Sequence, residues 1–319
     1  MSPIIAVTGA TGFIGSRFAQ RLGKKGRVRA LVRDPRRAQA LSRQGVEIVT
    51  GSLQDRSSLR QLVAGSHVVI HCAGATRGAG NAHFHSVNVE GTAELAAAAA
   101  EEASNPLFVQ ISSLAAREPA LSDYAATKRH SEEALAARQG LRWVILRPPP
   151  VYGPGDRELT PLFQWMMRGI APILGPRDAR FSMLYVDDLA EAVARLMDAP
   201  GIEGRIFELH DGYTDGYTWD KIIDIVARMT QRQMWRIHLP GAPLHAVAVL
   251  NRALASVLGY QPMFTPGKVR ELRHHDWMCD NSQITESTGW SPQIIIEQGL
   301  RLTLGLGAAS GADIHHRAD

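Results

Sequence analysis

The sequence of 319 residues predicts an α/β fold, in which a doubly wound parallel sheet carries a smaller, interwoven C-terminal lobe. Three observations support this fold class. Short, nearly continuous apolar runs alternate with helical patterns, as expected for a parallel sheet that helices cover on both faces. A glycine-rich turn joins the first apolar run to the first helix. No repeat or low-complexity linker divides the chain into separate units.

The expected strands are short and apolar: Ile4–Val7, Val28–Val32, Val46–Val49, Val68–Ile70, Phe108–Ile111 and Trp143–Leu146. Helices are expected at Thr92–Ala103 and Tyr124–Arg138, and Gly140 would stop the second one. After a proline-rich break, a helix at Val186–Met197 and a strand at Arg205–Leu209 return to the earlier pattern. We therefore assign residues 1–155, with a return segment at about 181–215, to the sheet domain, and residues 156–180 and 216–319 to the second lobe.

The composition is that of an ordinary globular protein, with 45% hydrophobic and 21% charged residues. The net charge is +4, and residues 1–50 contain ten Lys and Arg against two acids. Because no aromatic side chains interleave with these cations, we expect an anionic ligand there and no nucleic-acid binding. We expect no membrane span and no cleavable leader, and the two cysteines favour a reducing, cytoplasmic location. The pairs His274–His275 and His315–His316 lack metal-ligand spacing, so no metal is expected.

The turn after the first strand has the pattern of an anion-binding site. Glycines let a backbone approach a pyrophosphate, and the free N–H groups of a helix N-terminus point at it. We therefore predict that this turn binds the pyrophosphate of a dinucleotide. The residues concerned are Thr8, Gly9, Thr11, Gly12, Phe13, Ile14 and Gly15.

The end of the second strand predicts which dinucleotide is bound. An acidic residue there usually accepts hydrogen bonds from the ribose hydroxyls of NAD. Arg33 occupies this position and Arg37 follows it, so a guanidinium would pair with the 2′-phosphate of NADP. The alternative is NAD, with Asp34 on the ribose and Arg33 in solvent. Further cofactor contacts are expected where the next strands end: Ser52, Leu53, Cys72, Ala73 and Gly74.

Tyr124 and Lys128 lie four residues apart, on one face of a predicted helix. A free tyrosine has a pKa of about 10, so it exchanges protons poorly at neutral pH. A neighbouring ammonium group and an oxidised nicotinamide would both lower that pKa toward the working range. Ser113, which follows the fifth strand, would orient a carbonyl or alcohol beside Tyr124. This set of residues suits hydride transfer coupled to proton transfer.

The ordered set of motifs resembles the extended branch of the short-chain dehydrogenase/reductase superfamily, often labelled NAD-dependent epimerase/dehydratase-like. The matching segments are TGATGFIG at 8–15, HCAG at 71–74, VNVEGT at 87–92, ISS at 111–113, YAATK at 124–128, RPPPVYGPGD at 147–156, YVDDLAEAV at 185–193 and TGWSPQIIIEQGL at 288–300. The resemblance implies a Rossmann core, with Tyr124 as acid/base, Lys128 on the nicotinamide ribose and Ser113 on the reacting oxygen. It also implies that Asn88 completes the catalytic set and that Pro148 to Val151 border the nicotinamide.

Two departures from the family pattern bear on function. Leu114, Ala115 and Ala116 follow Ser113 where the family's sugar-nucleotide dehydratases carry an acidic pair, which argues against water elimination. Arg33 stands where the epimerases, which resemble tight NAD binders, carry an acid. We therefore expect an NADP-dependent oxidoreductase that interconverts a secondary alcohol and a ketone, similar to dihydroflavonol-reductase-like and hydroxysteroid-dehydrogenase-like members. The alternatives are a nucleoside-diphosphate-sugar epimerase with tightly bound NAD, and a non-catalytic NADP-binding subunit or sensor.

The helix expected at Pro243–Leu258 is rich in apolar residues. We expect it to pack in the core of the second lobe, and the alternative is that it roofs a lipophilic pocket. The resemblance also implies a homodimer, formed through the helices at Thr92–Ala103 and Tyr124–Arg138. The other expected partner is a small-molecule substrate, either lipophilic or a nucleotide sugar.

Overall fold

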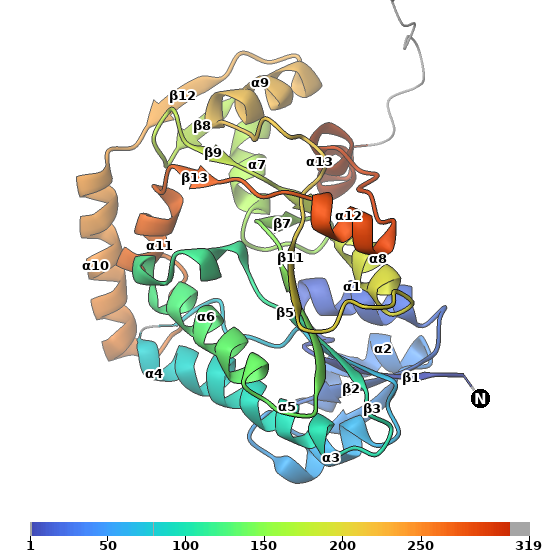
Figure 1. The fold of residues 1–319 in the computed structure, drawn as a ribbon. Helices are drawn as coiled ribbons and strands as arrows, with labels where there is room; N and C mark the ends of the chain where they lie inside the picture. Colours follow the sequence, from blue (N-terminus) through green and yellow to red (C-terminus); the bar gives the residue numbers. More distant parts are fainter. Residues whose placement is uncertain (1, 79, 307–319) are drawn as a thin grey trace, which may run out of the picture.

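The computed structural model describes residues 2–78 and 80–306, so the tail with His315 and His316 lies outside the described residues. Its centre is a seven-stranded sheet in the order β11-β6-β5-β4-β1-β2-β3, and every neighbouring pair is parallel (Figure 1). The strands are β1 (Ile4–Thr8), β2 (Arg27–Val32), β3 (Glu47–Thr50), β4 (Val68–His71), β5 (Leu107–Ile111), β6 (Arg142–Arg147) and β11 (Arg205–Glu208). The order reverses between β1 and β4, which is where ligands bind in such sheets. The predicted α/β, doubly wound fold class is confirmed.

Helices cover both faces of this sheet. On one face lie α1 (Phe13–Leu22) and α8 (Val186–Leu196), whose buried residues share a core with the strands. On the other face lie α3 (Arg56–Val63), α5 (Gly91–Ala100) and α6 (Asp123–Ala136). Both predicted helices are present, but they end earlier than expected, and Gly140 lies in the turn beyond α6 with φ +76°. A π-helical turn at His85–Glu90 leads directly into α5.

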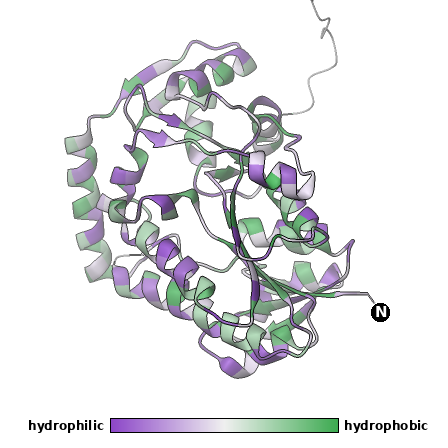
Figure 2. Ribbon diagram, in the orientation of Figure 1, coloured by the Kyte–Doolittle hydropathy of each residue, from purple (hydrophilic) through white to green (hydrophobic). Residues whose placement is uncertain are grey.

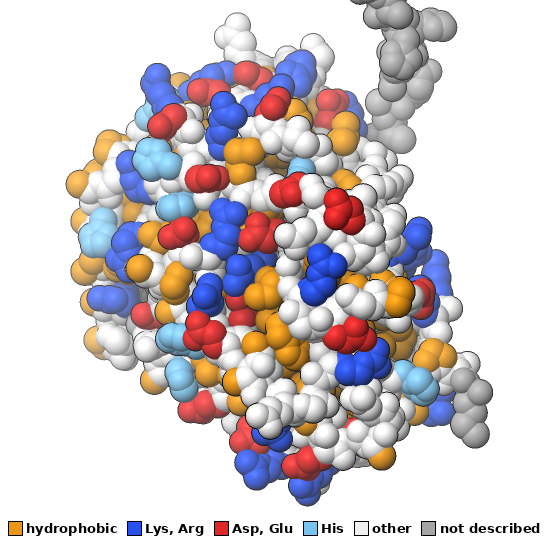
Figure 3. Space-filling view, viewed as in Figure 1, with side chains coloured by type: hydrophobic (Ala, Val, Ile, Leu, Met, Phe, Trp, Pro, Cys, Tyr) orange, Lys and Arg blue, Asp and Glu red, His pale blue; other side chains and the backbone are white. Residues whose placement is uncertain are grey.

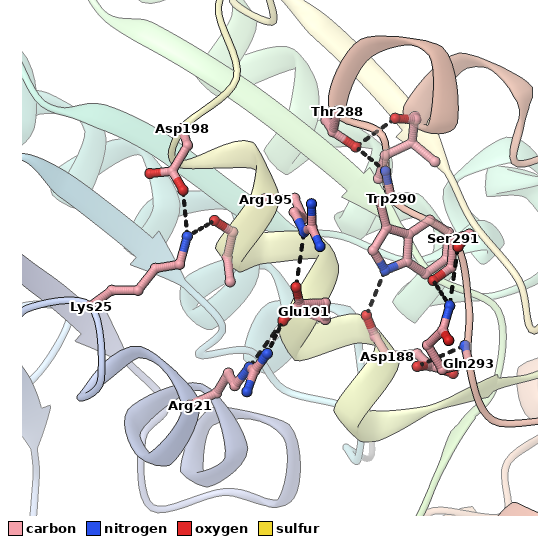
Figure 4. Close-up of polar contacts among 12 residues, drawn as sticks. Arg21, Lys25, Asp188, Glu191, Arg195, Asp198, Thr288, Trp290, Ser291 and Gln293 are labelled. Carbon is pink, nitrogen blue, oxygen red and sulfur yellow. Dashed lines mark hydrogen bonds and ion pairs between the residues drawn. The ribbon is translucent and has the colours of Figure 1, made fainter.

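The start of α8 ties three distant parts of the chain together (Figure 4). The carboxylate of Asp188 accepts hydrogen bonds from the backbone N–H groups of Gln293 (3.1 Å) and Ile294 (2.9 Å). The indole Nε1 of Trp290 donates to the Asp188 carbonyl at 3.1 Å. On the opposite side Glu191 pairs with Arg21 of α1. The VDD and TGWSP segments, which are about 100 residues apart in sequence, are therefore anchored to each other.

The later part of the chain builds a third hydrophobic core beside the sheet. Three two-stranded parallel sheets support it: β7 (Val151–Tyr152) with β10 (Leu184–Tyr185), β8 (Ile170–Ile173) with β12 (Trp235–His238), and β9 (Arg180–Phe181) with β13 (Asp276–Trp277). Its main helices are α7 (Thr160–Met167), α9 (Trp219–Thr230) and α13 (Ile296–Leu304). Each small sheet pairs strands from distant segments, so this region is interwoven, as the sequence predicts.

Helix α10 (Gly241–Leu258) forms one edge of the molecule (Figure 1). The expectation that it packs in a core is wrong: within it only Ala248 and Ala255 are buried, while Leu250 is 60% exposed. It packs against the short helix α11 (Pro266–Leu272) through one narrow side. Among the described residues it is also the one helix that is long and apolar enough, by length and composition alone, to cross a membrane.

Candidate active site

The glycine turn between β1 and α1 is shaped to admit a bound group. Gly9 has φ +74°, and a Cβ placed there would lie 2.7 Å from the backbone nitrogen of Ala73. A Cβ at Gly15 would lie 2.2 Å from the Gly9 carbonyl oxygen. Gly12 is the N-cap of α1 and offers no side-chain acceptor to the N–H groups of the first turn. The turn therefore fits a pyrophosphate held by backbone amides at a helix N-terminus.

A cavity of about 990 Å³ extends from this turn along the ends of β4, β5 and β6 to the segment around α11. Most of the predicted cofactor and catalytic residues line it: Gly9, Thr11, Gly12, Phe13, Ile14, Gly15, Arg37, Cys72, Gly74, Ser113, Tyr124, Pro148 and Val151. The structure thus brings the glycine turn and the two predicted catalytic hydroxyls to one space.

Three other predicted residues, Thr8, Ser52 and Leu53, do not line this cavity. The hydroxyl of Thr8 accepts a hydrogen bond from the Ala73 N–H at 3.2 Å and so shapes the β4 loop. Ser52 accepts from the Gln54 N–H at 3.3 Å, and Leu53 is buried in the core. The cofactor contacts predicted for Ser52 and Leu53 therefore have no counterpart in the cavity lining. Among the described residues, no group of three or more His, Cys, Asp or Glu side chains is placed to hold a metal.

A second, smaller cavity of about 300 Å³ lies at the end of β2. Thr11, Arg33, Asp34 and Arg37 contribute to its lining. Both carboxylate oxygens of Asp34 are engaged by the guanidinium of Arg36, at 2.9 and 3.1 Å. This hydrogen bonding lowers the pKa of Asp34. The acid of this cavity, Asp34, is thus already paired with Arg36, and Arg33 and Arg37 line the same space.

Tyr124 and Lys128 lie on the first and second turns of α6, as the spacing predicts, but their electrostatics differ from the expectation. Burial raises the pKa of Tyr124 to about 12, and the Ser113 hydroxyl offsets this only in part. The ammonium of Lys128 donates to the Ile111 carbonyl at 2.7 Å. Burial also lowers the pKa of Lys128 to about 8. In this structure Tyr124 is therefore a neutral phenol at neutral pH, and a neutral phenol can donate a proton.

Asn88 holds the wall of the cavity rather than facing it. Its side-chain oxygen accepts from the Ala75 N–H at 2.7 Å, and its amide nitrogen donates to the Thr127 hydroxyl at 3.1 Å. A Cβ at Gly74 would lie 3.2 Å from this oxygen and 4.0 Å from the Lys128 ammonium nitrogen. Asn88 therefore fixes the β4 loop against α6, beside the predicted catalytic lysine.

Sequence reasoning missed a charged cluster on α11 that faces Tyr124. The ammonium of Lys268 pairs with the Glu271 carboxylate at 3.1 Å, and that carboxylate also accepts from the hydroxyl of Ser122. Ser122 is in turn the N-cap of α6 and accepts from the Ala125 N–H at 2.9 Å. Lys268 lowers the pKa of Tyr124, and Glu271 raises it. No local pattern marks these residues, because only the fold brings α11 against the start of α6.

A buried ion pair behind the site was also missed. Glu132, one helical turn after Lys128, meets the Arg147 guanidinium at 2.6 Å, with side-chain exposures of 3% and 12%. The Ser112 hydroxyl donates to the same carboxylate. This network joins α6 to the ends of β5 and β6, and so fixes the position of the helix that carries Tyr124.

Burial of the Lys128 ammonium is expected to lower the free energy of unfolding. Its pKa is about 8 in the folded chain and 10.5 ordinarily, so between these values the unfolded chain binds more protons and stability rises with pH. We expect Lys128→Met to raise the free energy of unfolding at neutral pH by about 2 kcal/mol, after subtracting the lost hydrogen bond to Ile111. Urea unfolding across this pH range checks this. The variant should also lose the rise with pH.

The exposed Lys24 provides the control, because Lys24→Met should change stability by less than about 0.5 kcal/mol and keep the pH profile. A Lys128→Met protein that is less stable than the wild type at neutral pH would contradict this interpretation of the buried ammonium.

Comparison with known proteins agrees with this geometry. The family described as "NAD dependent epimerase/dehydratase family" matches residues 5–209. The chain is 37% identical over 285 residues to ceramide reductase of Caulobacter vibrioides, covering 89% of this chain and 88% of that one. It is 33% identical over 175 residues to a farnesyl-dihydroquinoline-oxide ketoreductase of Stigmatella aurantiaca, covering 49% of this chain and 52% of that one.

Among solved structures, UDP-glucuronic acid 4-epimerase of Bacillus cereus, in complex with UDP-glucuronic acid and NAD, superposes with a TM-score of 0.74. It is 19% identical and covers 95% of this chain and 98% of that one, so this likeness shows the fold alone. The glycine turn, the Ser113–Tyr124–Lys128 arrangement and the family match agree with one another. This chain is an NAD(P)-dependent enzyme of the NAD-dependent epimerase/dehydratase family, within the extended short-chain dehydrogenase/reductases.

Proposed function

We propose that this enzyme is an NADP-dependent reductase of a lipophilic ketone, working reversibly as a secondary-alcohol dehydrogenase. The observation that carries the proposal is that Ser113 and Tyr124 line the same cavity as the glycine turn. When bound in that turn, the dinucleotide supplies the hydride. A carbonyl between the two hydroxyls would lie at the point where hydride and proton must both arrive.

The residues of the chain supply the proton and the alignment. Tyr124 donates its phenolic proton to the substrate oxygen, and Ser113 holds that oxygen by a hydrogen bond. Lys128 places a positive charge on the same side of α6 and favours the phenolate that forms. Glu132 and Arg147 keep α6 in register with the strand ends, so the hydroxyls stay aligned.

The lining of the large cavity supports a lipophilic substrate. Beside charged residues such as Arg157 and Glu158, the lining includes apolar and aromatic side chains: Phe84, Leu114, Leu162, Met183, Trp219 and Phe264. The similarity to ceramide reductase, over most of both chains, points to a ketone on a ceramide-type lipid. NADPH oxidation measured with such a ketone tests the proposal. Turnover of a UDP-sugar, with NAD retained through purification, would instead support an epimerase.

A preference for NADP follows from the cavity at the end of β2. Arg33 and Arg37 line it, while Asp34 is paired with Arg36. We expect Arg33→Ala to raise the KM for NADPH by about 10- to 100-fold, because a charge-assisted hydrogen bond to the 2′-phosphate is lost. The KM for NADH should barely change. Steady-state kinetics with both nucleotides measures this.

Arg43→Ala is the matched control, because it removes the same charge from an exposed site at the end of α2 (Gln39–Arg43). It should leave both KM values within about twofold. Equal losses for NADPH and NADH in the Arg33→Ala variant would argue that Arg33 does not read the 2′-phosphate.

We further propose that the protein is a homodimer in the cytoplasm. The neighbouring helices α5 and α6 lie on one outer face of the sheet, where a second copy would complete a four-helix arrangement (Figure 1). Sedimentation velocity over a range of protein concentrations tests the dimer. A mass that stays at 34.8 kDa throughout would contradict it.

A further inference from the structure

Helix α10 carries an apolar stripe that no described part of the chain covers. The stripe consists of Val247, Leu250, Leu254, Val257 and Leu258. Its spacing of three and four residues places these side chains along one side of the helix. Their exposure is high throughout and reaches 82% at Val257. Figure 2 shows α10 as a largely hydrophobic helix at the edge of the molecule, and Figure 3 shows apolar side chains exposed along that edge.

The opposite side of α10 holds the helix firmly in place. The small buried residues Ala248 and Ala255 allow close packing against the rest of the fold. The side-chain amide of Asn251 donates to the Phe264 carbonyl at 2.7 Å. The stripe is therefore part of a helix that is fixed in place. Its five adjacent side chains form a continuous apolar patch, unlike the single exposed leucines and valines found on most protein surfaces.

The segment that carries the stripe has a positive net charge. Helix α10 contains Arg252 and His245 and no acidic residue. Residues 241–275 carry four Lys and Arg against a single acid, Glu271, which already pairs with Lys268. The side chain of Arg273 lies against the first residue of α10, since a Cβ at Gly241 would meet its Nε at 2.8 Å. A helix with an apolar stripe, with cations on its other side and without acids has the composition of a helix that lies on anionic lipid.

A second copy of this chain is the other obvious occupant, since a two-fold contact through α10 would place the stripe on itself. A bilayer with anionic headgroups meets both features at once. It takes the apolar side chains into the acyl boundary and leaves the cations at the headgroups.

We propose that α10 docks this enzyme on the surface of an anionic phospholipid bilayer, lying in the plane of the interface and not across it. Crossing would strip water from Arg252 and would break the packing of α10 on α11. This inference goes beyond the proposed function, because it does not depend on which reaction is catalysed. It also has a consequence for that function.

The helix that would meet the bilayer also forms part of the cavity wall. Arg252 of α10, and Pro262, Met263 and Phe264 just after it, line the large cavity. Docking would bring this wall to within about one helix diameter, roughly 10–12 Å, of the lipid. A lipophilic ketone would then have a short path from the bilayer to Tyr124.

Flotation of the full-length protein with vesicles tests the proposal. The probe is phosphatidylcholine with phosphatidylglycerol as the minority lipid, compared with phosphatidylcholine alone. The test variant is Leu250→Glu/Leu254→Glu, and the matched control is Ile295→Glu/Leu302→Glu, which introduces the same charge at two exposed apolar positions on another face. We expect the wild type and the control to float with the anionic vesicles, and the test variant to lose at least about tenfold in bound fraction.

The outcomes are separable. Equal flotation of all three proteins, or no flotation of the wild type, overturns the proposal. Val257→Glu provides a second variant if the double substitution lowers the thermal midpoint. A concentration-dependent dimer that Leu250→Glu/Leu254→Glu abolishes also overturns it, because a second copy then covers the stripe. Flotation without any ketone reduction contradicts the proposed function and leaves the docking surface supported.

Discussion

Tyr124→Phe is expected to lower kcat by about 100- to 10,000-fold, the usual contribution of a positioned general acid. The substitution removes one oxygen from a half-buried side chain that lines the cavity together with Ser113. The binding of NADPH should be unchanged, because the glycine turn and the Arg33 cavity are untouched. Steady-state turnover and nucleotide fluorescence titration measure the two quantities separately.

Tyr152→Phe is the matched control. Tyr152 is fully buried, and its hydroxyl has no hydrogen-bond partner among the described residues. Removing that oxygen should leave kcat within about twofold and should not lower stability, because a buried unpaired polar group is itself unfavourable. If Tyr124→Phe retained wild-type turnover of every ketone that the enzyme reduces, another group would have to supply the proton.

Glu132→Ala is expected to destabilise the fold by about 3–5 kcal/mol, because it leaves the Arg147 guanidinium buried without its partner. The hydroxyl of Ser112 loses its acceptor in the same variant. Since this network joins α6 to β5 and β6, activity should also fall in the fraction that remains folded. Urea unfolding gives the free energy, and kcat measured below the transition gives the positional effect.

The next residue on the helix provides the comparison. Glu133 is exposed and pairs with Arg129 at 2.9 Å, so Glu133→Ala should cost less than about 0.5 kcal/mol. The double variant Glu132→Leu/Arg147→Met should recover much of the loss, because it removes both buried charges. If Glu132→Ala and Glu133→Ala lowered the free energy of unfolding by similar amounts, burial of the Glu132–Arg147 pair would not explain the cost of breaking it.

The fold could be predicted from local patterns because the signals for each element lie within the element or next to it in sequence. Short apolar strands, the Gly9–Gly15 turn and the Tyr124–Lys128 spacing all depend on residues close in sequence. A parallel sheet then brings the strand ends together, so Ser113 and Tyr124 reach one cavity without any further information. The family resemblance rests on the same segments, and the family match confirms it.

Other features could not be predicted because they are set by tertiary contacts. Lys268 and Glu271 affect Tyr124 only because α11 lies against the start of α6. The partner of Glu132 is on a strand, and nothing in the spacing selects Arg147. The apolar pattern of α10 is typical of a core helix, so sequence alone places it inside, whereas the fold leaves its stripe outside.

The pKa of Tyr124 was expected to fall, and in the structure burial raises it to about 12. The expected fall concerns the complex with an oxidised nicotinamide, whose positive charge favours the phenolate, whereas the rise concerns the protein without a nucleotide. Burial cannot be predicted from the Tyr-x-x-x-Lys spacing, and it is the largest influence here. Tyr124 is therefore expected to donate its proton as a neutral phenol during ketone reduction, and to ionise, and so to act as a base in the reverse reaction, only in the complex with the oxidised nucleotide.

The claim that the bound nucleotide and Lys128 lower the pKa of Tyr124 is tested most directly by ultraviolet difference titration of the tyrosines, with the spectrum of Tyr124→Phe subtracted from that of the wild type. In the free protein we predict that Tyr124 ionises at a pH of about 12. With saturating NADP⁺ the midpoint should fall by several pH units, and in Lys128→Met the fall should be smaller. If the ionisation midpoint of Tyr124 were the same with and without NADP⁺, the assignment of Tyr124 as the proton donor would be contradicted. If the fall of the midpoint with NADP⁺ were as large in Lys128→Met as in the wild type, the tuning of Tyr124 by Lys128 would be contradicted.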